Sequence, residues 1–185
     1  MEIELFKNKN LFNNNFFVNL KNNEKLFLFY SLALFIVPIF ITNQLITGTI
    51  VNALLISSAF RNSTKRIMIL CAIPSIAVLS IGVLFGSLTH FVLILMPFIW
   101  ISNFIITFAS KKLFLQKKMN YFISTFASAV AKTIFLFTSV SILFYFALVP
   151  QVFLTAFGII QLITAISGAI IVGFLKYHNT IILEQ

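Results

Sequence analysis

The sequence predicts an all-α membrane protein, a bundle of six transmembrane helices with the N and C termini on the cytoplasmic side. Hydrophobic residues make up 60% of the chain and charged residues only 9%, which is too little charge for the surface of a soluble domain. The apolar residues also form long blocks separated by short polar breaks. Most blocks approach the roughly 20 residues that cross a hydrocarbon core about 30 Å thick.

Six apolar blocks follow a polar N-terminal segment, residues 1–25. The predicted membrane helices cover approximately residues 26–44, 45–60, 67–86, 90–110, 120–148 and 152–175. Together they form one predicted transmembrane domain over 26–176, followed by a short cytoplasmic tail at 177–185. Block 45–60 is short and contains Asn52, so one spanning helix followed by a re-entrant segment is an alternative for this region. The N-terminal segment fits a short interfacial helix and a partly disordered leader equally well.

The basic residues set the predicted topology. The N-terminal segment and the breaks at 61–66 and 111–118 carry nearly all the lysines and arginines, whereas the other three breaks carry none. Short loops rich in Lys and Arg stay in the cytoplasm. Six crossings with cytoplasmic termini, in the plasma membrane, place every basic residue outside the helices on that side. The basic residues therefore indicate membrane topology, and we expect no nucleic-acid partner.

The acidic residues exclude several classes of protein. The chain has no Asp, and its four Glu are all near the ends, at Glu2, Glu4, Glu24 and Glu184. Ion-coupled carriers, membrane phosphotransferases and aspartyl peptidases need a carboxylate at membrane depth. The sequence also has no phosphate-binding loop, no Ser–His pair placed for catalysis and no metal-ligand spacing. We therefore expect no enzyme activity, no cofactor and no metal, and any transport must draw energy from another subunit.

Lys132 is the most informative residue, because it lies near the middle of the fifth apolar block. A charge at that depth costs about 2.5 kcal/mol or more on insertion scales, so the side chain should face the bundle interior and have a partner. One interpretation is a cation that meets an anionic or carbonyl-bearing ligand. The alternative is a structural lysine bonded to helix carbonyls or neighbouring amides. The lack of a membrane carboxylate favours the first interpretation.

Other polar and aromatic side chains lie at related depths. Asn103 and Trp100 are in the fourth block, Asn52 is in the second, and Gln161 and Thr164 are in the sixth. A single amide usually ties helices together. Several amides, a lysine and a tryptophan together fit a polar, aromatic-lined pocket better. Trp100 is too deep for an interfacial anchor, so it either packs in the core or stacks on a ligand.

Small residues recur at a spacing of four, which lets another helix approach closely. Ala165 and Ala169 form such a pair in the sixth block, and Ala127 and Ala131 form one in the fifth. They either pack inside the bundle or dock a partner subunit.

Four segments resemble the substrate-binding S components of energy-coupling factor (ECF) transporters. They are AFGIIQLITAISGAIIVGFLKY at 156–177, MPFIWISNFIITFASKKLF at 96–114, AVAKTIFLF at 129–137 and TGTIVNALLIS at 47–57. Their order and spacing match the hydrophobic layout of that family over roughly residues 26–176.

The resemblance implies a six-helix membrane subunit that captures a vitamin-like small molecule outside the cell. It implies partners as well, a transmembrane T component and two cytoplasmic ATPases that supply the energy. The family motifs place Asn103, Lys132, Gln161 and Asn52 at the substrate. Residues 26–44 lack the Ala-x-x-x-Ala pair that many members carry on the first helix, so docking uses other small residues or the partner differs. A membrane scaffold without a ligand is the alternative function.

Overall fold

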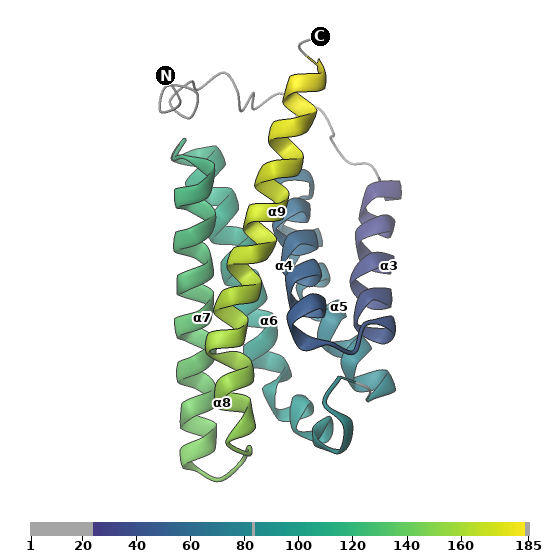
Figure 1. Ribbon diagram of the computed structural model, residues 1–185, viewed down its shortest axis with the longest axis vertical. Coiled ribbons are helices and arrows are strands. Elements are labelled where there is room, and N and C mark those ends of the chain that lie inside the picture. Colours follow the sequence, from purple (N-terminus) through teal and green to yellow (C-terminus); the bar gives the residue numbers. More distant parts are fainter. Residues whose placement is uncertain (1–23, 83, 184–185) are drawn as a thin grey trace.

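The computed structural model describes residues 24–82 and 84–183, and every element in this part of the chain is a helix (Figure 1). The first half contains α3 (Glu24–Phe40), α4 (Gln44–Arg61), α5 (Thr64–Ile81) and the short 3₁₀ helix η1 (Gly86–Leu88). The second half contains α6 (His90–Lys111), the π-helical turn η2 (Lys112–Gln116), α7 (Tyr121–Tyr145), α8 (Val152–Phe157) and α9 (Ile159–Leu183). The predicted all-α fold is confirmed.

Four stretches in the described part of the chain are long and apolar enough to cross a membrane. They are Thr64–Ile81, His90–Gln116, Tyr121–Tyr145 and Val152–Lys176. The chain is thus a multi-pass membrane protein. Helix α3 has 17 residues, which is one turn short of 30 Å at roughly 1.5 Å per residue, and α4 carries several polar residues. The six-span count stays a prediction.

A three-residue link, residues 41–43, separates α3 and α4, and whether α4 spans the membrane or forms the alternative re-entrant segment stays a prediction. Asn43 begins α4 because its side chain accepts hydrogen bonds from the backbone N–H groups of Leu45 and Ile46, at 3.0 and 3.3 Å. Asn120 begins α7 in the same way by accepting from Phe122 N at 2.9 Å. The predicted interfacial helix or leader at 1–25 lies almost entirely outside the described residues.

The helices alternate in direction, so the basic segments meet at one end of the bundle (Figure 1). Lys111 Nζ donates to the carbonyl of Asn62, at 2.6 Å, which joins the link after α4 to the end of α6. Lys176 Nζ lies 4.1 Å from the ring centroid of Phe114, which joins α9 to η2. We call this the basic end. The opposite end holds the α3–α4 link, η1 and the α7–α8 link.

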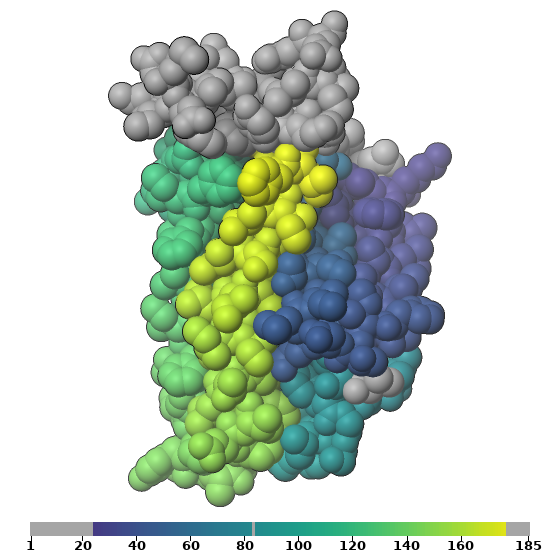
Figure 2. Space-filling view, in the orientation of Figure 1, coloured from purple at the N-terminus to yellow at the C-terminus, as the bar shows by residue number. Residues whose placement is uncertain are grey.

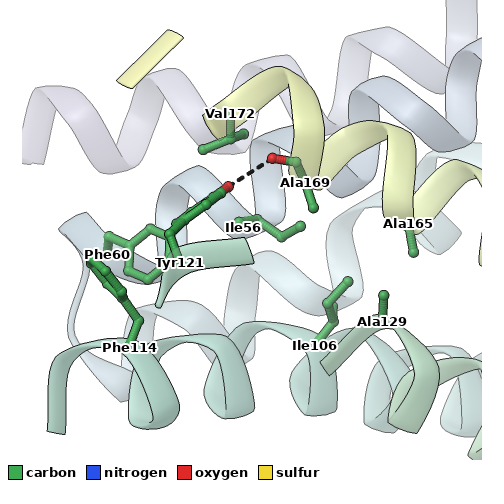
Figure 3. Close-up of a cluster of buried hydrophobic side chains, with 9 residues drawn as sticks. All are labelled: Ile56, Phe60, Ile106, Phe114, Tyr121, Ala129, Ala165, Ala169 and Val172. Atoms are coloured by element: carbon green, nitrogen blue, oxygen red, sulfur yellow. Dashed lines mark hydrogen bonds between the residues drawn. The ribbon is translucent and has the colours of Figure 1, made fainter. Parts of the chain in front are cut away.

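The core nearest the basic end is built from aromatic and small side chains of α4, α6, η2, α7 and α9 (Figure 3). The Tyr121 ring is fully buried, and its hydroxyl donates to the carbonyl of Ala169 at 2.9 Å. Figure 2 shows α9 lying between α7 and α4 on one face of the molecule, in agreement with the packing of α9 against both. This arrangement brings polar residues of α4, α7 and α9 to the same depth.

Candidate functional site

Lys132 lies at the centre of the bundle and is 1% exposed. Its Nζ donates to Oδ1 of Asn52 on α4 at 2.6 Å and to Oδ1 of Asn103 on α6 at 2.9 Å. Each residue lies near the middle of its helix, which is why three distant parts of the chain can meet at one depth.

Two further helices hold the amides in orientation. Nδ2 of Asn103 donates to the backbone carbonyl of Cys71 on α5 at 3.0 Å, and Nδ2 of Asn52 donates to Oγ1 of Thr164 on α9 at 3.2 Å. Because both amide nitrogens are committed to these acceptors, both amide oxygens face the lysine. We call these five residues the Lys132 cluster, which links α4, α5, α6, α7 and α9.

The Lys132 cluster provides hydrogen bonds but no negative charge. The chain has no Asp, and its one Glu in the described residues is Glu24, at the basic end of α3. Amide oxygens replace part of the water shell of an ammonium but do not neutralise it. An ammonium also has three donors, and the two amides use two of them.

A cavity of about 90 Å³ lies beside Lys132. It extends toward the opposite end, where Phe85 of the α5–α6 link and Phe157 of α8 contribute to its wall. The polar side chains in the wall are those of Gln44, Thr47, Asn52, Ser75, Asn103, Lys132 and Gln161. The remaining wall is largely aliphatic. A water molecule takes about 30 Å³ in the liquid, so the cavity in this conformation has room for a few waters or a fragment of similar size.

The structure brings together most of the residues that the sequence indicated. Lys132, Asn52, Asn103 and Gln161 all line the cavity. Thr164 is fully buried and reaches the site only through its hydrogen bond from Asn52.

Trp100 lies elsewhere. Its side chain is 37% exposed on the outer surface of the bundle, and its Nε1 donates to Oγ of Ser75 at 2.6 Å. Ser75 lines the cavity, so the indole contacts a residue of the cavity wall. Trp100 is therefore not a core residue, and its stacking on a ligand stays a prediction.

Gln44, Thr47 and Ser75 are cavity residues that the sequence analysis did not select. A spacing of four on α4 offered a signal, since Gln44, Gly48 and Asn52 share one helix face. The backbone carbonyl of Cys71 carried no signal in the side-chain pattern.

The two small-residue pairs have different surroundings. Ala165 and Ala169 are buried in the core nearest the basic end, where they pack inside the bundle. Ala127 and Ala131 are exposed on the outer face of α7. Of the two predicted docking pairs, the α7 pair is the more exposed, and docking of a partner stays a prediction.

In the described part of the chain, no group of three or more His, Cys, Asp or Glu side chains is close enough to hold a metal ion. Comparison with family models, with curated proteins and with solved structures found no match. The interpretation of the site therefore depends on its own geometry and on the motifs of the sequence.

Proposed function

We propose that this chain is the substrate-binding membrane subunit of a multi-component importer, similar to the S components of ECF transporters. The observation that carries the proposal is Lys132, a buried lysine that lines a cavity and has only neutral protein partners among the described residues. A buried charge without a counter-charge is costly, and a ligand that completes its coordination removes part of that cost.

Four polar side chains from four helices converge on the same cavity as Lys132, which supports a binding site for a small molecule. Asn52, Asn103 and Gln161 offer amide groups, and Ser75 offers a hydroxyl. Small-molecule sites combine a mostly apolar wall with a few placed polar groups in this way. Typical sites have volumes of roughly 300–1,000 Å³. A vitamin-sized ligand therefore requires the cavity to widen.

Energy for import has to come from partners in this proposal. The chain has no membrane carboxylate and no phosphate-binding loop. A transmembrane T component and cytoplasmic ATPases would bind to the bundle, with Ala127 and Ala131 as the accessible small-residue pair on α7.

One observation favours the alternative, a membrane scaffold without a ligand. The Lys132 cluster joins five helices by hydrogen bonds, which is what a purely structural polar cluster would do. A scaffold would keep this cluster whether or not a small molecule binds.

Mass spectrometry of the purified protein after denaturation separates the two functions. We expect a stoichiometric small molecule in the wild type and in the control variant Lys118→Met, whose lysine is exposed. We expect its loss in Lys132→Met, with unchanged helix content and a monodisperse gel-filtration profile. Co-purification of an ATPase pair would distinguish an importer subunit from a free-standing carrier.

Two results would contradict the proposal. One is retention of the molecule by Lys132→Met. The other is repeated absence of any molecule together with unchanged thermal stability across a panel of vitamins, which would favour the scaffold.

A further inference from the structure

We infer that the ligand of this cavity carries a carboxylate, which binds Lys132 Nζ between the oxygens of Asn52 and Asn103. This inference rests on the proposed function and narrows it from any small molecule to an organic acid. It depends on the orientation of the two amides and on the charges around them.

The orientation of the two amides means that neither presents an N–H donor toward Lys132. Nδ2 of Asn52 donates to Thr164 Oγ1 and Nδ2 of Asn103 donates to the Cys71 carbonyl, so neither amide nitrogen points at the lysine. Both amides act as acceptors toward Lys132. The centre of the site therefore offers a ligand one main feature, the positive N–H group of the lysine.

A neutral carbonyl on the ligand would gain little there. Asn52 and Asn103 already supply two neutral carbonyl oxygens at 2.6 and 2.9 Å, so a ligand carbonyl would offer Lys132 the same kind of acceptor. Any hydrogen bond from the ammonium is already strengthened by its charge, whereas an ammonium–carboxylate pair adds the attraction between two opposite charges in an interior of low dielectric constant. A carboxylate also neutralises the buried ammonium, which no amide can do.

A cationic ligand is disfavoured for the same reason. The described cavity wall contains Lys132 and no acidic side chain, so a second positive charge would be repelled. The wall beyond the cluster is aliphatic and aromatic at Val78, Val92, Ile99 and Phe85, which suits an apolar body attached to the acid group.

Pairs of acids and their carboxamides test this inference directly, because the two members have nearly the same shape and differ in charge. Acetate with acetamide and propionate with propionamide suit the present cavity of about 90 Å³. Nicotinate with nicotinamide tests the opened one. The readouts are the thermal unfolding midpoint in lipid nanodiscs and the fluorescence of Trp100, the single tryptophan of the chain, whose Nε1 binds the cavity residue Ser75.

We expect at least one acid to bind ten-fold or more tightly than its amide in the wild type and in Lys118→Met. The preference should disappear in Lys132→Met and persist in Lys132→Arg, which keeps the charge. Sodium chloride at matched ionic strength should give no comparable effect.

The inference is overturned if amides bind as tightly as acids, if no acid binds up to 100 mM, or if Lys132→Met keeps the preference. An equal response to chloride would also overturn it, because the site would then take inorganic anions. A neutral molecule found by mass spectrometry would leave the proposed function intact and refute only the carboxylate. If no molecule is retained and no probe binds, both proposals fail.

Discussion

At the scale of single residues, the binding properties of Lys132 depend on the two amides that it contacts and on the hydrogen-bond partners of those amides. Its two amide partners are each fixed by a hydrogen bond to a different helix, through Thr164 and the Cys71 carbonyl. A half-satisfied buried polar network is expensive, so each second partner stabilises the orientation of the first. Both amides accept a hydrogen bond from Lys132, but their Nδ2 groups donate to different partners. The partner of Asn52 is a hydroxyl, and the partner of Asn103 is a backbone carbonyl.

That difference predicts unequal effects for Asn52→Asp and Asn103→Asp. Both place a carboxylate beside the ammonium. Asn52 donates to the Thr164 hydroxyl, which itself donates to the backbone carbonyl of Gln161 at 3.1 Å and can turn to donate to the new carboxylate instead. Behind Asn103 is the Cys71 carbonyl, which only accepts, so two oxygens would face each other without a hydrogen. We expect Asn103→Asp to be less stable than Asn52→Asp by about 1–3 kcal/mol, the cost of an unsatisfied buried group.

Thermal unfolding in nanodiscs measures this difference, and alanine variants at the same two positions normalise for lost packing. Both Asp variants should also lose the preference for acids, since an internal acid already neutralises Lys132. Equal stability of the two variants, or a more stable Asn103→Asp, would contradict the hydrogen-bond pattern.

Residue types and depths could be read from the sequence, whereas helix rotation could not. The isolated Lys132 and the amides Asn52, Asn103 and Gln161 were found because polar groups in apolar blocks are costly and stand out. The exposure of Trp100 on the outer surface depends on how α6 packs against α5. Depth follows from counting residues, while rotation is a tertiary property.

At the scale of the elements, α4 and α9 share the most extensive contact among the described helices, and glycines lie at their crossing. An added Cβ at Gly168 would lie 2.7 Å from the backbone nitrogen of Ala53 and 2.9 Å from the carbonyl oxygen of Thr49. A Cβ at Gly48 would lie 2.9 Å from Cγ2 of Thr164. The two glycines let the helix backbones approach, which brings Asn52 within reach of Thr164.

Gly168→Ala should therefore destabilise the protein and weaken the site together. The neighbouring atoms belong to the backbone of α4, so the helices must separate. Overpacking of this kind costs about 1–3 kcal/mol. The matched control is Ile170→Ala, at an exposed position on the same helix, with an expected change within about 0.5 kcal/mol. The measurements are thermal unfolding and acid binding. If both are unchanged in Gly168→Ala, α4 and α9 pack less closely than the structure indicates.

The helix boundaries show how far the apolar pattern reaches. Predicted blocks such as 90–110 and 120–148 lie within a few residues of α6 and α7. The sixth block was predicted as one helix, but the structure breaks it at Gly158 into α8 and α9. The π-helical turn η2 after α6 was not predicted either. The break at Gly158 is a change of backbone hydrogen bonding inside apolar sequence, where hydropathy does not change, whereas η2 lies in the basic break at 111–118, where no helix was predicted.

For the whole molecule, the cavity and the basic segments have opposite positions. The described basic residues other than Lys132 gather at the basic end, while the cavity extends toward Phe85 and Phe157 at the opposite end. Basic loops remain in the cytoplasm, so this arrangement would open the cavity to the outside. A capture subunit needs that orientation, whereas a scaffold does not.

Single-cysteine labelling tests the orientation in intact cells. Cys71 is the only cysteine, so Cys71→Ser gives a cysteine-free background. Ser87→Cys then reports on η1 at the opposite end, and Lys117→Cys reports on the basic end; both positions are exposed. With a maleimide that cannot cross membranes, we expect labelling of Ser87→Cys in intact cells and of Lys117→Cys only after permeabilisation. The reverse pattern would open the cavity to the cytoplasm and remove the basis for extracellular capture. Labelling of both variants in intact cells would be incompatible with helices that cross the membrane in alternation, because the two positions flank α6 at its two ends.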